Sequence, residues 1–117
     1  PRSWVSIVFE GLIAPRAGTQ TEAYAAGRLW ARTEGTIPAP ETCNALAQVV
    51  KEAQQAKEEG KAKVIVATFS GHGLLDLAAY EKYLAGNLQD VGLSDDELRQ
   101  GTAVFAGYPK PQRLKSR

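Results

Sequence analysis

The residues best suited to chemistry follow one short apolar run. Residues 63–69 are mostly apolar and rich in β-branched side chains, and Ser70, Gly71, His72 and Gly73 come directly after them. A short β-branched run closed by glycine predicts a strand buried on both faces. Open α/β sheets bind ligands just beyond the carboxyl ends of such strands, so the Ser70 hydroxyl is predicted to contact a ligand. The alternative is that it only satisfies a backbone group.

The single cysteine and the single histidine are weaker candidates. Cys43 falls on the apolar face of a predicted helix and far from the histidine in sequence, so we expect it to be packed rather than nucleophilic. His72 stands between two glycines, where it could carry a proton, contact a ligand or simply lie in a surface loop. One histidine and one cysteine without ligand spacing predict no metal site. A lone cysteine also fits a reducing compartment, and we expect a cytoplasmic protein.

Composition indicates one domain and excludes two classes of partner. The chain has 117 residues with 14 basic and 13 acidic side chains, so its net charge of +1 favours neither nucleic acid nor a membrane surface. No segment reaches the ~18 apolar residues of a membrane span. Residues 108–117 form a basic tail that we expect to be flexible. The chain starts at Pro1 and contains no methionine, so we expect a fragment, a processed chain or a split chain.

Several helices are predicted around the apolar run. Apolar residues at helical spacing, together with proline, glycine and hydroxyl capping residues, mark the boundaries. The predicted helices cover residues 4–13, 19–35, 40–60 and 74–84, with a short one starting at Ser94. Thr102 to Phe105 could add a brief edge strand.

The order of these elements predicts an α/β fold. Only one strong strand, Val64 to Phe69, is present, and a buried strand must pair or leave its backbone groups unsatisfied. We therefore expect an incomplete sheet that a longer chain or a second chain completes.

Two segments together resemble a known family. They run from Ala31 to Thr42 (Ala-Arg-Thr-Glu-Gly-Thr-Ile-Pro-Ala-Pro-Glu-Thr) and from Phe69 to Leu77 (Phe-Ser-Gly-His-Gly-Leu-Leu-Asp-Leu). With them the chain, from about Val5 to Leu84, resembles the C-terminal part of the tryptophan synthase β chain, and more closely its second, tryptophan synthase β-like type. The resemblance implies pyridoxal phosphate as cofactor and the C-terminal portion of fold type II, with amphipathic helices packed around a buried parallel strand.

The resemblance also implies roles for individual residues. Ser70 matches the serine whose hydroxyl hydrogen-bonds the pyridine nitrogen of the cofactor, and Gly71 matches the loop that lets the backbone pass close by. Glu34 matches a glutamate whose carboxylate lies beside the cofactor ring, and Gly35 follows it in the same turn. A solvated helix end is the alternative for Glu34, although the helix dipole disfavours a carboxylate there.

The implied parent reaction is a lyase reaction of amino-acid biosynthesis. It replaces the hydroxyl of L-serine with indole to give L-tryptophan, in an enzyme expected to be a homodimer. The family's Schiff-base lysine, phosphate loop and indole-binding acid lie upstream, and nothing here matches them. We therefore expect no catalytic residue in this segment and no catalysis by the chain alone. The alternatives are a fold type II enzyme acting on another substrate, or a truncated or split-chain module for binding or assembly.

Overall fold

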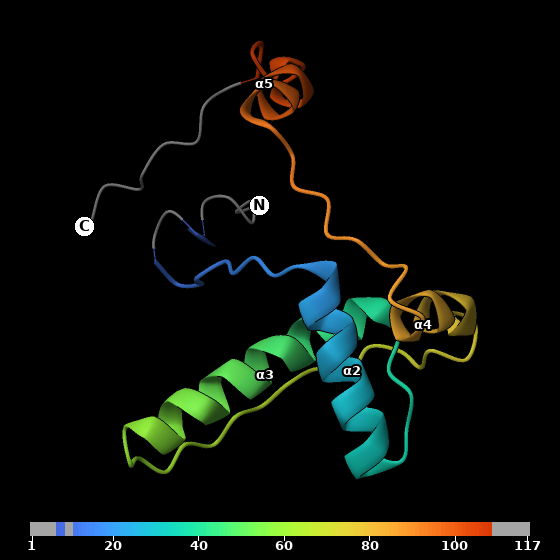
Figure 1. Cartoon of the computed structure of the whole chain (residues 1–117). Helices are drawn as coiled ribbons and strands as arrows, with labels where there is room; N and C mark the ends of the chain where they lie inside the picture. Colours follow the sequence, from blue (N-terminus) through green and yellow to red (C-terminus); the bar gives the residue numbers. More distant parts are fainter. Residues whose placement is uncertain (1–6, 9–10, 109–117) are drawn as a thin grey trace. The chain divides into compact units, whose positions relative to one another are not determined.

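The structure is a computed structural model that describes residues 7–8 and 11–108 (Figure 1). Four helices have described bounds: α2 (Gln20–Glu34), α3 (Pro40–Glu58), α4 (Leu77–Leu84) and α5 (Asp95–Ala103). Two compact units hold them, with α2, α3 and α4 in residues 18–90 and α5 in the unit of residues 1–17 and 91–117.

Two terminal predictions fall largely outside the described part of the chain. Residues 7 and 8 are helical and residues 11–13 form a turn and a bend, while residues 4–6, 9 and 10 of the predicted helix over residues 4–13 are not described. The basic side chains of the predicted tail also lie outside it, at Lys110, Arg113, Lys115 and Arg117. The helix and the flexible tail therefore stay predictions.

Local capping chemistry sets the ends of α2 and α5 as the sequence predicts. The Thr19 hydroxyl accepts a hydrogen bond from the Glu22 N–H, and the Glu22 carboxylate accepts one from the Thr19 N–H, each at 3.2 Å. Ser94 and Glu97 make the same reciprocal pair at the start of α5. Such a capping box satisfies two N–H groups that have no partner inside the helix. Gly35, with φ +75°, ends α2 in the left-handed conformation.

The other helix boundaries are close to the predicted ones. α3 begins at Pro40, which suits the first helical position because its missing N–H is not needed there. α4 begins at Leu77 rather than Leu74, because a turn comes first in which the Asp76 N–H donates to the Gly73 carbonyl at 2.9 Å. The edge strand predicted over residues 102–105 is wrong, since these residues complete α5 and the turn after it.

The buried strand predicted over Val64 to Phe69 is also wrong. The described residues contain no strand, and the β pairing among them is one isolated antiparallel bridge, between Pro38 and His72. Val64 is 95% and Val66 92% exposed. A strand needs a neighbour to pair its backbone groups, and no other described segment lies beside this one in extended pairing. The predicted α/β arrangement of helices around a buried parallel strand is thus not seen here.

The extended run instead returns along α3 (Figure 1). At its start the Lys63 ammonium lies 3.5 Å from the Glu52 carboxylate on α3. At its end the Phe69 ring lies 5.7 Å from the Trp30 ring on α2. These contacts bring the residues after Phe69 back to the connection between α2 and α3.

The core of the 18–90 unit forms where α2 meets α3 and α4. One cluster between α2 and α3 consists of Ala26, Leu46 and Ala47, with Trp30 and Val50 packed against it. A second cluster joins all three helices and consists of Ala23, Tyr24, Cys43 and Tyr80. The Tyr24 ring meets Tyr80 edge-on at 4.9 Å and stacks on Tyr83 at 5.7 Å. Such aromatic pairs add to the free energy gained by burial.

A buried hydrogen bond ties α4 to the connection between α2 and α3. The Tyr80 hydroxyl donates to the Pro38 carbonyl oxygen at 2.7 Å and lies 3.1 Å from the Cys43 sulfur. Pro38 and Cys43 are fully buried. Gly27 makes room for this group, because a Cβ there would collide with the Cys43 sulfur and lie 2.6 Å from the Tyr80 hydroxyl.

We predict that Tyr80→Phe lowers the free energy of unfolding by about 1–3 kcal/mol, because it leaves the buried Pro38 carbonyl without its donor. Urea unfolding measures this loss. Tyr83→Phe is the matched control, since none of the described hydrogen bonds uses the Tyr83 hydroxyl, and it should change stability by less than ~0.5 kcal/mol. Equal losses in the two variants would contradict the assigned role of Tyr80.

Candidate functional site

Ser70 and Gly71 lie against the first turn of α3. The Ser70 hydroxyl oxygen is 2.9 Å from the Thr42 hydroxyl oxygen. The Gly71 N–H donates to that same Thr42 oxygen at 3.2 Å. Thr42 is 1% exposed, whereas Ser70 is exposed. The buried Thr42 therefore contacts Ser70 on one side, and Ser70 remains exposed to solvent on the other.

Backbone hydrogen bonds join the two segments that carry the resemblance. The Ala39 N–H donates to the Gly71 carbonyl, and the Gly73 N–H donates to the Ile37 carbonyl, both at 2.8 Å. These bonds form the antiparallel bridge centred on Pro38 and His72. The connection at residues 35–39 and the loop at residues 70–73 thus form one crossing, which we call the motif crossing.

The two glycines of the loop have different structural roles. A Cβ at Gly73 would collide with the Pro38 carbonyl oxygen and lie 3.0 Å from the Ile37 side chain. A Cβ at Gly71 would meet only Ala39, at an ordinary contact distance of 3.4 Å. Gly73 is therefore required by the motif crossing itself. The role predicted for Gly71, close passage beside a ligand, stays a prediction.

Glu34 and Gly35 lie at the other end of the connection. Glu34 is the last residue of α2, and the Gly35 N–H donates to the Ala31 carbonyl at 3.2 Å to close that helix. Both residues are exposed. None of the described hydrogen bonds links either of them to Ser70 or Gly71. The structure thus joins Ser70 and Gly71 through Thr42, and the predicted position of Glu34 and Gly35 beside the same ligand stays a prediction.

Sequence reasoning missed two residues of this site. Thr42 is the last residue of the first motif, and its position in the first turn of α3 beside the buried Cys43 is the one signal that could have drawn attention to it. Helical spacing places Tyr80 on the apolar face of α4 but does not show that its hydroxyl donates to the Pro38 carbonyl of the motif crossing. Neither partner could be identified from helical spacing, because both contacts join distant segments.

The remaining reactive side chains have local roles. The His72 Nδ1 accepts a hydrogen bond from the Leu74 N–H at 3.3 Å, within its own loop. Cys43 is packed as expected, and burial raises the pKa of its thiol, which disfavours the nucleophilic thiolate. No group of three or more potential metal ligands occurs among residues 7–8 and 11–108.

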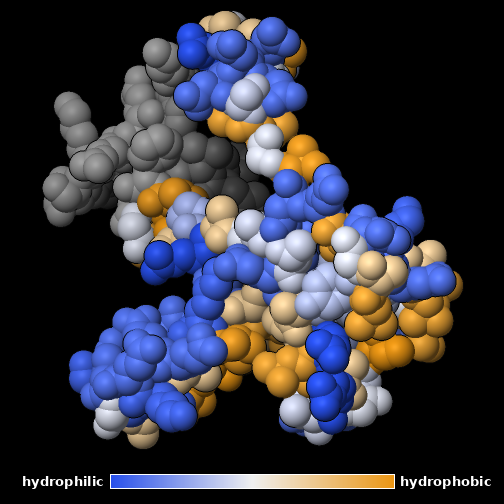
Figure 2. Space-filling model, viewed as in Figure 1, coloured by the Kyte–Doolittle hydropathy of each residue, from blue (hydrophilic) through white to orange (hydrophobic). Residues whose placement is uncertain are grey.

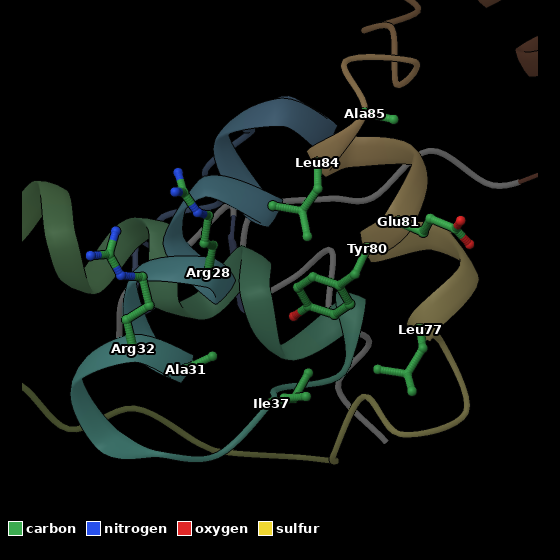
Figure 3. Close-up of a pocket in the computed structure, with 9 residues that line it drawn as sticks. All are labelled: Arg28, Ala31, Arg32, Ile37, Leu77, Tyr80, Glu81, Leu84 and Ala85. Carbon is green, nitrogen blue, oxygen red and sulfur yellow. The ribbon is translucent and has the colours of Figure 1, made fainter.

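An apolar groove of about 640 Å³ lies between α2 and α4 (Figure 3). Leu77, Tyr80 and Leu84 project into it from α4, opposite Ala31 and Ile37. Further lining residues are Arg28, Arg32, Glu81 and Ala85. The lining of the groove does not include Ser70, Gly71 or Thr42, and it shares only Ile37 with the motif crossing. It belongs to the hydrophobic surface visible over α4 in Figure 2.

We predict that Gly73→Ala destabilises the chain by about 1–3 kcal/mol, because the added Cβ must push the two segments of the motif crossing apart. Gly71→Ala is the control two residues away and should be tolerated. Thermal unfolding of both variants measures the difference. If Gly71→Ala costs as much as Gly73→Ala, the described close approach at Gly73 is wrong.

We predict that stability falls as pH rises through the range in which the Cys43 thiol titrates in the unfolded chain, near pH ~8.5. The folded chain raises the thiol pKa, so it binds more protons than the unfolded chain there, and unfolding becomes easier with rising pH. Urea unfolding between about pH 7.5 and about pH 9.5 measures the slope. Cys43→Ala should flatten it, and an unchanged slope would refute the assignment.

Several known proteins are similar to this chain in sequence. No family model matches the chain. A tryptophan synthase beta chain of Thermococcus gammatolerans is 50% identical over 84 residues, which cover 72% of this chain and 19% of that protein. The tryptophan synthase beta chain 2 of Pyrococcus furiosus is 49% identical over 84 residues, with the same coverage of both chains.

The tryptophan synthase beta chain 2 of Thermotoga maritima is 54% identical over 74 residues, which cover 63% of this chain and 18% of that protein. The chain thus spans about a fifth of the length of the curated relatives it matches. In the part that the structure describes, no helix combines the length and apolar character needed to cross a membrane. The resemblance inferred from the two motifs is confirmed, because 63–72% of this chain is similar in sequence to tryptophan synthase β chains.

Proposed function

We propose that this chain is the part of a pyridoxal-phosphate-dependent tryptophan synthase β-like lyase that contacts the pyridine nitrogen of the cofactor. The complete protein would join L-serine and indole to give L-tryptophan and water. The sequence identity of 44–54% to tryptophan synthase β chains supports the parent activity. We further propose the expected homodimer and cytoplasmic location for the complete protein.

The observation that carries the proposal is the exposed residue Ser70 at the motif crossing. Its oxygen contacts Thr42 on one side, and the residue is exposed on the other. An uncharged hydroxyl fits a pyridine nitrogen, because it can donate to the neutral ring or accept from the protonated one. An aspartate there would favour the protonated ring by charge attraction. The bound cofactor would supply an electron sink for chemistry at the amino acid.

The other predicted contacts would complete one wall of the site. The Gly71 backbone is held by Thr42 and Ala39, so its position beside Ser70 is well defined. Glu34 and Gly35 are exposed and accessible to a ligand. We propose that they border the same cofactor from the far end of the connection at residues 35–39.

A second candidate function is assembly with more polypeptide, on the same chain or on a second one. Several large apolar side chains are almost fully exposed, including Val64 at 95%, Val66 at 92% and Leu75 at 92%. Single exposed apolar residues are common, but a contiguous run of them marks a surface that another segment covers. This function is compatible with the first, since assembly would place Ser70 beside a cofactor held elsewhere.

We predict that Ser70→Ala in the complete enzyme weakens cofactor binding about fivefold to tenfold, the value of one hydrogen bond to a polar ligand atom. Ser70→Asp should instead change the absorption spectrum of the bound cofactor toward the protonated ring. Equilibrium dialysis and absorption spectroscopy measure the two effects.

Thr68→Ala is the matched control, because Thr68 is exposed nearby and its hydroxyl makes none of the described hydrogen bonds. It should leave both quantities unchanged. Wild-type affinity and spectrum in both Ser70 variants would refute the proposed contact.

A further inference from the structure

The apolar groove between α2 and α4 has walls of different relief. Leu77 and Leu84 project into it from α4, and these large side chains are 49% and 65% exposed. The α2 wall presents Ala31, which is small. Close packing at an interface needs large side chains opposite small ones. A second surface of the same kind therefore fits this groove when its leucines lie against the alanine.

The two rims of the groove carry opposite charges. Arg28 and Arg32 extend from α2, one helical turn apart, and Glu81 extends from α4 on the other side (Figure 3). All three residues are exposed, and none of the described ion pairs includes them. Like charges at positions i and i+4 repel each other on a helix. The arginine pair would therefore gain from an acidic partner.

The groove itself carries the acid that such a partner needs. If a second copy faces the first across a twofold axis that runs along the groove, α4 of each copy lies opposite α2 of the other. Glu81 of each copy then faces the rim that carries Arg28 and Arg32. A twofold axis across the groove would instead place α2 against α2 and bring four arginines together, which charge repulsion disfavours. The charges thus select one of the two arrangements.

We propose that this groove is a self-association surface, on which two copies of the chain bind with α4 of each against α2 of the other. Leu77 and Leu84 of one copy would cover Ala31 of the other, and a glutamate facing two arginines would flank this apolar centre on both sides. The inference rests on the homodimer proposed above, for which it names a surface, and not on the cofactor contact at Ser70.

Charge reversal tests the surface, with analytical ultracentrifugation of the 117-residue chain as the measurement. The wild-type chain should form a concentration-dependent dimer. Glu81→Arg makes both rims basic, and Arg28→Glu combined with Arg32→Glu makes both rims acidic, so each variant should self-associate at least about tenfold more weakly. A one-to-one mixture of the two variants should associate again, because every basic rim then faces an acidic one.

Matched controls reverse charges outside the groove. Lys57→Glu changes a basic residue in the last turn of α3, as Arg32→Glu does in α2, and Glu58→Arg changes its neighbour. Both control residues are exposed, and none of the described ion pairs includes them. Neither substitution should change the dissociation constant of the dimer.

Circular dichroism of every variant checks that its helices are kept. If a reversed variant loses them, two milder substitutions at exposed positions replace it. Leu84→Gln removes apolar contact area and Glu81→Gln removes one charge, so each should weaken self-association at least about threefold. Wild-type association in both of these variants would overturn the proposal.

A chain that stays monomeric up to about 1 mM would also overturn it, as would a dimer that both reversals leave intact or a mixture of the two that does not associate. The same reversals in the complete protein separate the surface from the proposed function. A homodimer that they leave intact has its interface elsewhere, which refutes this surface and leaves the cofactor contact standing. If the reversals dissociate the dimer and Ser70→Ala changes nothing, the surface stands and the cofactor contact is wrong.

Discussion

The carbonyl of Pro38 is the group on which the motif crossing depends. It is buried away from water, so it needs a donor inside the protein, and the Tyr80 hydroxyl supplies one at 2.7 Å. The same carbonyl limits the approach of the loop at residues 70–73, because only glycine fits beside it at position 73. One peptide group therefore determines how α4 docks and how closely the loop can pass.

The helix boundaries were predictable because they depend on neighbours in sequence. Thr19 and Glu22 cap α2 through atoms three residues apart, and Gly35 ends that helix through its own backbone freedom. The prediction of a strand over residues 64–69 is wrong for the opposite reason, because a strand depends on a segment that is distant in sequence. An apolar β-branched run indicates a preference, but a strand exists only when another segment pairs with it, and that segment is not among the described residues.

Those features of the candidate site that depend on neighbours in sequence were also predictable. Ser70 was singled out because a polar residue closes an apolar run, and its exposure agrees with a ligand contact. Thr42 could not be singled out, because its partner lies 28 residues further along the chain. Glu34, in contrast, lies at the end of α2 as the sequence predicts, because Gly35 ends that helix locally. Residues that act through a distant neighbour become visible only once the chain is folded.

The exposed run at residues 64–69 has a further consequence for how the chain behaves during synthesis. The described residues contain no strand that pairs with its backbone N–H and C=O groups. The side chains of Val64 and Val66 are exposed. A short, uncharged segment of this kind is a template for pairing with identical segments of other molecules. Within the described part of the chain, this run is therefore the segment at which aggregation would begin wherever no other segment covers it.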